Sequence, residues 1–442
     1  MQEEHQPQAV TASKKVINGW AMYDWANSVY NLVITTTFFP VYYTEMTKSA
    51  FNEQVPFLGR TYVNTALYNY ALAFTYLLVA FTLPILSSIA DYKGNKKRFM
   101  QVFCFMGATA CSSLYFFDKN HFDTGIFSMM IAAYGFYASL VFYNSYLPEI
   151  AAPKDRDRIS ARGFSFGYIG SVLMQMIGFG LVVMWDKIPF LKSEGDAVKF
   201  TFLLVGLWWF GFAQIPFARL PRGIPAAENG EKRNVFTGGF IELKKVFHQL
   251  WAIPVLKRFL LAFFFYNMGV QTVMLAATNF GSKVLNLPST KLIITVVIIQ
   301  LVAIIGAWGM SRLSERFGNF PVLLGVVSFW VLVCIAGYYM QTEYHFYGLA
   351  VAVGLVMGGI QSLSRSTYSK LMPPTKDTAS FFSFYDVTEK IAIVIGLTAF
   401  GYIEEFTGSM RNSVLALMAF FALGLIFLFY AWRSPRPKYL QQ

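Results

Sequence analysis

The sequence predicts an all-α membrane protein with twelve transmembrane helices in two pseudo-symmetric six-helix bundles. The first observation is composition, since the 442 residues are 55% hydrophobic and only 14% charged, with a mean hydropathy of +0.46. A soluble chain carries about a quarter charged residues because its surface must face water. The second observation is a series of long apolar runs, and the third is a loop that occurs once in each half of the chain.

The apolar runs divide into two sets of six. A membrane-spanning helix needs about 20 mostly apolar residues. In the first half such runs lie near residues 21–43, 66–89, 99–117, 124–147, 163–185 and 200–218. In the second half they lie near residues 259–281, 291–311, 321–340, 345–364, 381–403 and 412–432. We therefore divide the chain into an N-terminal tail (1–16), a first bundle (17–218), a linker (219–256), a second bundle (257–433) and a C-terminal tail (434–442).

The placement of Lys and Arg predicts the orientation of the helices. The two tails, the linker and alternate loops hold most of the 36 Lys and Arg residues, and segments with that excess face the cytoplasm. Both termini are therefore expected to be cytoplasmic. The net charge of +12 then reflects topology and gives no reason to expect a nucleic-acid partner. Because no cleavable signal peptide is visible, we expect a multi-pass protein of a bacterial inner (cytoplasmic) membrane.

The linker has two parts. Residues 221–234, PRGIPAAENGEKRN, have the composition of a flexible connection. Residues 236–251, FTGGFIELKKVFHQLW, predict an amphipathic helix that lies on the cytoplasmic membrane surface, either as a tether or as a regulatory element. The apolar face of this helix would consist of Leu243, Val246, Phe247, Leu250 and Trp251.

One loop motif occurs in both halves. The loop after the second run reads ADYKGNKKRF and the loop after the eighth reads SERFGNFPVL, so that Asp91 and Gly94 correspond to Glu315 and Gly318. Equivalent loops half a chain apart indicate internal duplication, which is common in transporters. Glycine suits a tight turn, and an acid can engage a helix N-terminus in the neighbouring bundle. We expect these four residues to act in gating or in contacts between the bundles.

The loop motif and four longer segments carry a family resemblance. The acid-x-x-Gly loop followed by basic residues resembles the signature between helices 2 and 3 of the major facilitator superfamily, although Tyr92 stands where a basic residue is common. Four longer segments resemble the vacuole-effluxer-like branch of that superfamily, the autophagy-related vacuolar amino-acid effluxers. They are GWAMYDWANSVYNLVITTTFFP (19–40), PEIAAPKDRDRISARGFSFGYIGS (148–171), GGIQSLSRSTYSKLMP (358–373) and FFSFYDVTEK (381–390).

The resemblance covers essentially the whole chain and implies the major facilitator fold and a transport function. One position departs from the family pattern, because Met268 stands where we associate an Asp with the family. This departure weakens any role for a carboxylate in the seventh helix.

Polar residues in the first and seventh runs are candidates for a transport path. Such groups are costly in lipid and tend to face a bundle interior or a water-filled cavity. In the first run Asp24, Asn27 and Asn31 follow helical spacing together with Ser28 and Thr35, and Asp24 is a candidate proton or cation site. In the seventh run Tyr266, Asn267 and Gln271 are expected to face the first helix across a central cavity. Hydrogen bonding between packed helices is the alternative for both sets.

Charged residues in the tenth and eleventh runs form a further set. Asp386, Glu389 and Lys390 lie in the eleventh run, where Asp386 and Lys390 are four residues apart and can pair. They form either an ionisable transport site or a clamp that breaks when the bundles rock. Arg365 follows Gln361 in the segment QSLSRS. It either binds a substrate carboxylate in bidentate fashion or meets phosphate headgroups.

These features predict a secondary active transporter that works by alternating access and exports or exchanges a small polar metabolite, an amino acid by family resemblance. The alternatives are efflux of amphipathic or lipid-like compounds, and a receptor or scaffold of the same fold that does not transport. The sequence shows no nucleophile–base pairing, phosphate loop or metal-ligand cluster, so we expect no enzymatic activity, cofactor or metal site. Coupling to H⁺ or Na⁺ stays open, and we expect a monomer in a lipid bilayer with a small-molecule substrate.

Overall fold

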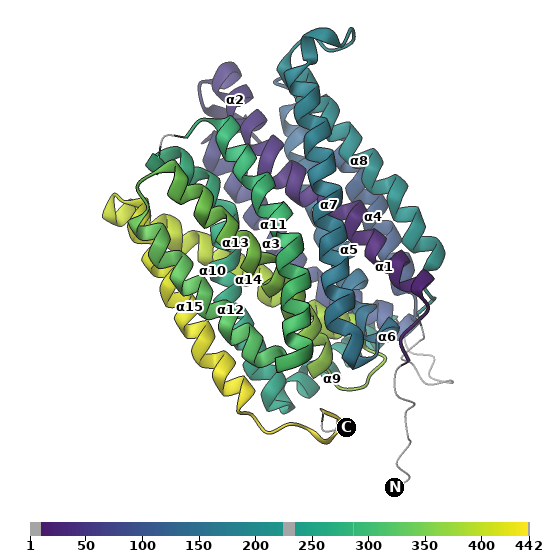
Figure 1. Ribbon diagram of the computed structural model, residues 1–442. Coiled ribbons are helices and arrows are strands. Elements are labelled where there is room, and N and C mark those ends of the chain that lie inside the picture. The colour runs from purple at the N-terminus through teal and green to yellow at the C-terminus, as the bar shows by residue number, and fades with distance from the viewer. Residues whose placement is uncertain (1–9, 224–234, 286, 441–442) are drawn as a thin grey trace.

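The computed structural model describes residues 10–223, 235–285 and 287–440 (Figure 1). The beginning and the end of the described chain lie at one end of the molecule, together with α6 (Leu147–Ile150) and α9 (Val235–Ala252). Hydrogen bonds agree with this placement, because the Ala12 amide donates to the Ile150 carbonyl at 2.8 Å and the Tyr439 hydroxyl donates to the Leu371 carbonyl at 3.0 Å. We call this end the terminal side.

The first half begins with a long helical run that changes its winding in the middle. The run consists of α1 (Lys14–Val29), the π-helix η1 (Tyr30–Phe38) and α2 (Phe39–Phe51). A short hairpin follows, in which β1 (Gln54–Phe57) pairs antiparallel with β2 (Arg60–Val63). The other long helices of this half are α3 (Asn64–Lys93), α4 (Lys96–Ser113), α5 (Phe122–Ser145), α7 (Arg156–Val183) and α8 (Glu194–Arg219). Single turns connect them at η2 (Leu114–Phe116), α6, η3 (Pro153–Asp155) and η4 (Trp185–Lys187).

The second half follows α9 and repeats this arrangement of long helices. It contains α10 (Pro254–Leu285), α11 (Ser289–Phe317), α12 (Asn319–Tyr339), α13 (Glu343–Leu371), α14 (Thr378–Thr407) and α15 (Met410–Trp432), and ends near η5 (Lys438–Leu440). Most of the predicted flexible connection, from residue 224 to 234, lies outside the described residues. The amphipathic helix predicted after it is present as α9, in which Val246 and Leu250 are buried while Phe247 and Trp251 are exposed.

Ten helices among the described residues are long and apolar enough to cross a membrane. They fit ten of the twelve predicted runs in order. The remaining two runs are the α1–η1–α2 segment, whose winding changes at the π-helix, and α14, which carries Asp386, Glu389 and Lys390 in its middle. Polar groups in the centre of a membrane helix mark a functional position more often than a structural one. The two exceptional segments are therefore the first places to look for a site.

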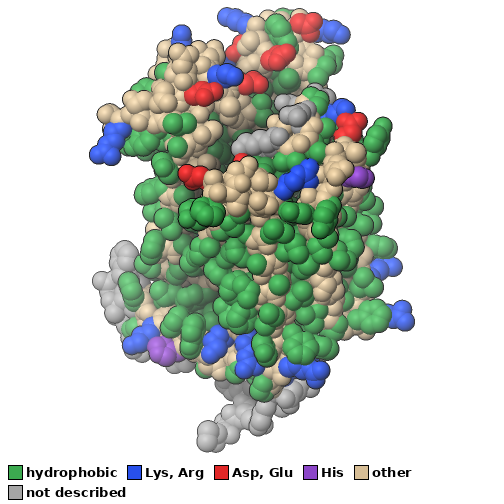
Figure 2. Space-filling view, turned by 90° about the vertical axis from the view of Figure 1, so that its left-hand side faces the viewer, with side chains coloured by type: hydrophobic (Ala, Val, Ile, Leu, Met, Phe, Trp, Pro, Cys, Tyr) green, Lys and Arg blue, Asp and Glu red, His purple; other side chains and the backbone are tan. Residues whose placement is uncertain are grey.

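The surface of the molecule is typical of an integral membrane protein. Figure 2 shows a broad band of hydrophobic side chains around the middle of the molecule, with charged side chains gathered towards its two ends. On the face shown, Lys and Arg lie at the terminal side, whereas Asp and Glu lie with Lys and Arg towards the other end. The exposed apolar side chains include Phe81, Ile305 and Phe329, which lie on the long apolar helices α3, α11 and α12. They face lipid, where exposed apolar surface carries no hydration penalty.

The repeated loop ends a long helix in both halves. Gly94 follows α3 with φ of 64°, and Gly318 follows α11 with φ of 83°. A positive φ is readily adopted by glycine and strained for residues with a Cβ atom. This requirement explains why glycine stands at both positions, and each loop passes directly into the next helix, α4 or α12.

The two halves meet along pairs of helices from opposite halves. α3 and α5 pack against α14, and α7 packs against α11 and α13. These pairs bring the ends of the repeated loops close to the starts of α14 and α7. The contacts between the halves therefore include Asp91, one of the residues that the sequence singled out for gating.

Candidate functional site

A polar cavity lies between the two halves. It has a volume of about 1140 Å³, which includes the open space at its mouth. Its walls come from α1, η1, α3, α5 and α7 of the first half and from α10, α13 and α14 of the second. The predicted residues that line it are Asp24, Asn27, Asn31, Asn267, Gln271, Gln361, Arg365, Asp386, Glu389 and Lys390.

The polar stripe of the first helix faces this cavity, with one shift of register. Asp24, Asn27 and Asn31 line the cavity as their helical spacing predicts, but Thr36 lines it in place of Thr35. The π-helix η1 explains the shift, because its hydrogen bonds run from residue i to i+5 and the residue that follows Asn31 on the same face is therefore five positions on. Sequence spacing alone assumes an α-helix and could not predict this change.

Hydroxyl and amide side chains stabilise the π-helix at one carbonyl. The Leu32 carbonyl oxygen accepts hydrogen bonds from the hydroxyls of Thr36 and Thr37, at 2.8 and 2.9 Å, and from the Gln175 amide at 2.9 Å. A carbonyl at the centre of a membrane helix needs such partners wherever the α-helical ladder is interrupted. Thr36 and Thr37, together with Gln175, are thus part of the reason why the helix can widen here.

Arg365 and Asp24 form an ion pair across the two halves at one end of the cavity. Arg365 Nη1 on α13 lies 3.3 Å from Asp24 Oδ2 on α1, and the Tyr143 hydroxyl donates to the same oxygen at 2.7 Å. The guanidinium also donates to Ser160 Oγ at 2.9 Å and to the Ser160 carbonyl at 2.8 Å, and Nη1 donates to Asn144 Oδ1 at 3.1 Å. Arg365 is only 3% exposed, so it lies at the interface between the halves and away from the membrane surface.

Aromatic rings and a glycine hold this ion pair in place. The Arg365 guanidinium lies 4.2 Å from the ring centre of Phe164 and 4.8 Å from that of Trp20. A Cβ atom at Gly163 would lie 2.5 Å from Asp24 Oδ2 and 2.9 Å from Arg365 Nη2. Only glycine leaves room for the pair on this side. Gly163 lies four residues before Gly167, a spacing that permits close helix packing, but nothing in this spacing indicates contact with an ion pair.

The three charged residues of α14 pair with one another beside the cavity. Lys390 Nζ lies 3.1 Å from Asp386 Oδ1 and 3.2 Å from Glu389 Oε1. The ammonium group also lies 4.2 Å from the ring centre of Tyr137 on α5, in the other half. Glu389 accepts a hydrogen bond from the Gln271 amide at 3.5 Å. The acid–base contacts of these three residues are therefore within α14, and a cation–π contact joins Lys390 to the first half.

Four other predicted residues lie in different surroundings. Gln361 accepts a hydrogen bond of 2.6 Å from the Tyr168 hydroxyl and so joins α13 to α7. Asn267 and Gln271 line the cavity from α10. Tyr266 does not line it, because its hydroxyl is buried against Ser364 Oγ at 2.7 Å. The structure thus places Tyr266 in the packing between α10 and α13.

Several buried polar atoms of the cavity have no hydrogen-bond partner among the described residues. They are both side-chain polar atoms of Asn27, the Nδ2 atom of Asn267 and the Oδ2 atom of Asp386. Asn27 belongs to the first half, and Asn267 and Asp386 belong to the second. Buried polar groups are nearly always hydrogen-bonded. These atoms are therefore available to hydrogen-bond with water or with a ligand between the two halves.

At the terminal side, Asp91 contacts the first turn of α14. Its Oδ2 atom accepts hydrogen bonds from the Ser380 amide and hydroxyl, both at 2.7 Å, and its Oδ1 atom accepts one from the Ala379 amide at 3.3 Å. A carboxylate at a helix N-terminus compensates unpaired amides and the positive end of the helix dipole. Gly94 ends α3 three residues later and turns the chain away from this contact.

The second copy of the loop is used differently. Glu315 is exposed, and the acid at the corresponding interface is Asp157, in the first turn of α7. Asp157 accepts hydrogen bonds from Ser314 Oγ and Asn319 Nδ2, each at 2.8 Å, and from Lys370 Nζ at 2.6 Å. At the first loop, the acid belongs to the loop itself (Asp91) and contacts the start of α14. At the second loop, the acid belongs to the start of α7 (Asp157) and contacts residues of the loop. Gly318 retains the turn, but Asp157 was not identified from sequence because no loop repeat marks it.

The linker helix α9 adds a contact on the terminal side. Lys245 Nζ lies 2.9 Å from Asp377 Oδ2, directly before α14, and 3.0 Å from Glu242 Oε2. Partial burial lowers the pKa of Lys245, but the hydrogen bonds and charges of Asp377 and Glu242 outweigh this effect and raise its pKa above the ordinary value. Lys245 therefore keeps its positive charge and connects the linker helix to the start of α14.

Comparisons with known proteins agree with this architecture. Residues 12–434 match the family described as "Vacuole effluxer Atg22 like". The chain is 31% identical to the uncharacterised MFS-type transporter YxiO of Bacillus subtilis (strain 168), with 93% of each chain covered. It is 24% identical to autophagy-related protein 22-1 of Penicillium rubens, with 96% of this chain and 91% of the relative covered.

Solved structures show the same fold at low sequence identity. The fucose transporter FucP in the outward conformation has a TM-score of 0.69 and 13% identity, over 95% of this chain and 99% of that chain. An outward-facing bacterial homologue of the iron transporter ferroportin has a TM-score of 0.68 and 13% identity, over 95% and 99% of the two chains. With the family match over nearly the whole length, the chain belongs to the vacuole effluxer Atg22-like family of major facilitator superfamily transporters.

Proposed function

We propose that this protein is a secondary active transporter that works by alternating access and exports or exchanges a small zwitterionic metabolite, such as an amino acid. The observation that carries the proposal is the set of buried polar atoms on Asn27, Asn267 and Asp386 that lie around one cavity and have no partner in the described part of the chain. These atoms come from both halves. A ligand that bonds to both would favour closure of the halves around it, which is what alternating access requires.

A zwitterion matches the distribution of charge in the cavity. Arg365 and the amide of Asn27 are donors that suit a carboxylate, and they lie on the α1 and α13 walls. Asp386 and Glu389 on α14 are acceptors that suit an ammonium group. Asn267 and Gln271 on α10 complete the site, because their amides can hydrogen-bond to either the carboxylate or the ammonium group of the zwitterion. The amino-acid effluxer resemblance of the sequence supports the same substrate class.

The contacts at the terminal side support an alternating-access cycle. Asp91 with Ser380, and Asp157 with Lys370, join the two halves on that side of the cavity. We assign the terminal side to the cytoplasm, because Lys and Arg gather there on the face shown in Figure 2. In this assignment the described conformation is closed towards the cytoplasm. Opening to the cytoplasm requires that both groups of contacts break.

The charges of the cavity support coupling to a cation. Three carboxylates, those of Asp24, Asp386 and Glu389, face two cations, Arg365 and Lys390. An unpaired charge is costly inside a membrane protein, so closure of the cavity around a neutral zwitterion favours uptake of one H⁺ or Na⁺. We assign Glu389 as the residue that binds this H⁺ or Na⁺, because it is the more exposed of the two acids that contact Lys390.

A ligand screen tests the proposal. Purified protein in lipid nanodiscs is heated with amino acids, dipeptides, sugars, nucleosides or amphipathic drugs, and binding raises the melting temperature by mass action. We expect a shift with one or more amino acids that is lost in Asn27→Ala and Asn267→Ala. Thr272→Val is the matched control, because Thr272 bonds only within α10 to the Met268 carbonyl and does not line the cavity.

Other outcomes would decide between the alternatives. Shifts with amphipathic compounds alone would replace the metabolite by an amphipathic substrate. The absence of any shift, together with no uptake of radiolabelled amino acids into proteoliposomes, would contradict a transport role and favour a receptor or scaffold of this fold.

A further inference from the structure

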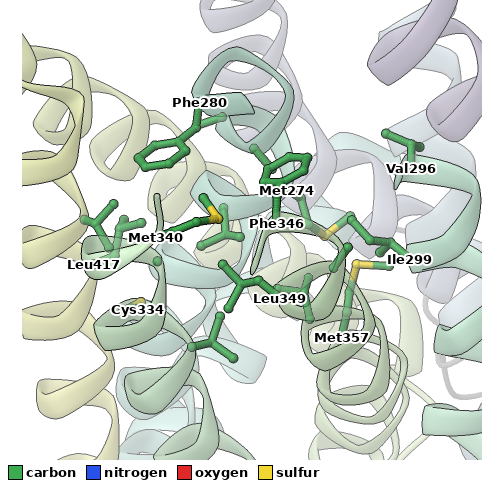
Figure 3. A pocket seen from close by; sticks show the side chains of 18 of the residues that line it. Met274, Phe280, Val296, Ile299, Cys334, Met340, Phe346, Leu349, Met357 and Leu417 are labelled. Atoms are coloured by element: carbon green, nitrogen blue, oxygen red, sulfur yellow. The ribbon is translucent and has the colours of Figure 1, made fainter. Parts of the chain in front are cut away.

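A second, apolar cavity is lined mainly by the second half of the chain (Figure 3). It has a volume of about 1040 Å³, including its opening, and its walls come mainly from α10, α11, α12, α13 and α15. Leu32, Thr36 and Met274 border both cavities, and the other lining residues of the apolar cavity, which we call the chamber, do not line the polar one. The transport site described above makes no use of this chamber.

The lining suits an aromatic molecule. Figure 3 shows Phe280, Phe346 and the sulfur-bearing side chains of Met274, Met340 and Met357 around the same space. Methionine side chains adapt to the shape of a ligand, and their sulfur atoms make favourable contacts with aromatic rings. The wall therefore offers adaptable apolar contact and no charge, because no Asp, Glu, Lys or Arg borders the chamber among the described residues.

One polar side chain interrupts this apolar wall. Gln300 on α11 borders the chamber and is 1% exposed, and neither its Nε2 nor its Oε1 atom has a hydrogen-bond partner among the described residues. The other hydroxyl or amide side chain of the lining, Thr36, already donates to the Leu32 carbonyl at 2.8 Å. A buried amide with both ends unpaired is strongly unfavourable, and more so in a membrane protein. A ligand that supplies one donor and acceptor would satisfy it.

We propose that this chamber is a binding site for a neutral aromatic molecule with a single hydroxyl or similar group, which bonds to the Gln300 amide while its rings lie among the methionine and phenylalanine side chains. The chemistry differs from that of the polar cavity, which takes charged groups. The proposal does not rest on the proposed transport function, because it concerns a different set of residues and a neutral ligand.

The pair 1-naphthol and naphthalene tests the role of the amide, since the two molecules differ by one hydroxyl group. Their affinities are measured by fluorescence with the protein in nanodiscs, after subtraction of partition into empty nanodiscs. We expect the protein to bind 1-naphthol about tenfold more tightly than naphthalene, the factor that corresponds to one net hydrogen bond. In Gln300→Leu and Gln300→Met this preference is expected to disappear while naphthalene still binds.

A second substitution tests the location. Ala350 is buried and borders the chamber, whereas Val351 beside it on α13 is 41% exposed and does not. Ala350→Phe fills the chamber and is expected to abolish binding of both molecules. Val351→Phe adds the same ring on the lipid side and is expected to leave both affinities unchanged.

Three results would overturn the proposal. Equal affinities for 1-naphthol and naphthalene in the unaltered protein would mean that the chamber binds any apolar group, such as a lipid chain, and that Gln300 makes no hydrogen bond to the ligand. A naphthol preference that persists in both Gln300 variants would place the hydroxyl elsewhere. Binding that survives Ala350→Phe, in protein that still elutes as a single folded species, would place the whole molecule elsewhere.

Discussion

Arg365 on α13 and Asp24 on α1 form a buried ion pair across the two halves of the chain, with Nη1 3.3 Å from Oδ2. The pair lies at one end of the polar cavity and is surrounded by Tyr143, Ser160 and the ring of Phe164. A charge pair in this position both joins the halves and borders the ligand site. It is therefore placed to couple ligand binding to the relative position of the halves.

Removal of one member of this pair should leave the other charge buried and unpaired. Asp24→Asn is expected to destabilise the protein by about 3–5 kcal/mol, since the Arg365 cation keeps its burial and loses its partner. The double variant Asp24→Asn/Arg365→Gln should recover most of the melting temperature but not substrate binding. Melting curves in nanodiscs, combined as a double-mutant cycle, measure the coupling. Additive losses would contradict the pairing.

Gly163 should tolerate no side chain. A Cβ atom there would lie 2.5 Å from Asp24 Oδ2, so Gly163→Ala is expected to push the pair apart and to cost about 1–3 kcal/mol, the usual range for overpacking. Gly180→Ala on the same helix is the matched control, because a Cβ atom there meets nothing within 4 Å. Similar melting temperatures for the two variants would mean that the close contact is not required.

Asp91 should stabilise the conformation that is closed at the terminal side. Asp91→Asn keeps the shape but removes the charge from the first turn of α14, and a helix-terminus interaction of about 1 kcal/mol corresponds to a roughly fivefold change in the ratio of two conformations. Distances between spin labels on the terminal ends of α3 and α14 report this ratio. Glu315→Gln is the control, because Glu315 is exposed and no change is expected.

Cation coupling through Glu389 should be separable from substrate binding. Glu389→Gln removes the carboxylate that lies in excess of the two cations of the cavity, so transport by this variant is expected to follow the substrate gradient alone. Uptake into proteoliposomes with and without an imposed H⁺ or Na⁺ gradient measures the difference. A variant that still responds to the same ion gradient as the unaltered protein would exclude Glu389 as the coupling site.

The contact between α9 and α14 should be insensitive to pH near neutrality. The pKa of Lys245 is raised in the folded protein, so its contribution to stability is fully present below its unfolded pKa of about 10.4 and is lost only as the pH rises through the higher folded value. Hydrogen exchange of α9 is therefore expected to show equal protection at pH 6 and 8.5, after correction for the intrinsic rates. Lys245→Met should reduce this protection at both values, and a loss confined to pH 8.5 in the unaltered protein would contradict the raised pKa.

Much of the architecture could be predicted from the sequence because it depends on local composition. Apolar runs of membrane length set the order of the helices, and the loop motif at Gly94 and Gly318 marked two helix ends that do turn at positive φ. The polar stripe from Asp24 to Asn31 could also be predicted, since polar groups in a membrane helix face away from lipid.

The sequence by itself determined that this protein lies in a membrane, how its helices follow one another and which of them carry polar groups, since these properties follow from the transfer of each segment from water to lipid. The tertiary structure alone decided the pairings. It placed Arg365 against Asp24, brought Asp157 rather than Glu315 to the second loop, and left Gln300 beside an apolar chamber with no hydrogen-bond partner among the residues that the structure describes. Such contacts depend on how helices distant in the chain dock and, at η1, on a local change of winding, and neither is encoded in the spacing of residues along one helix.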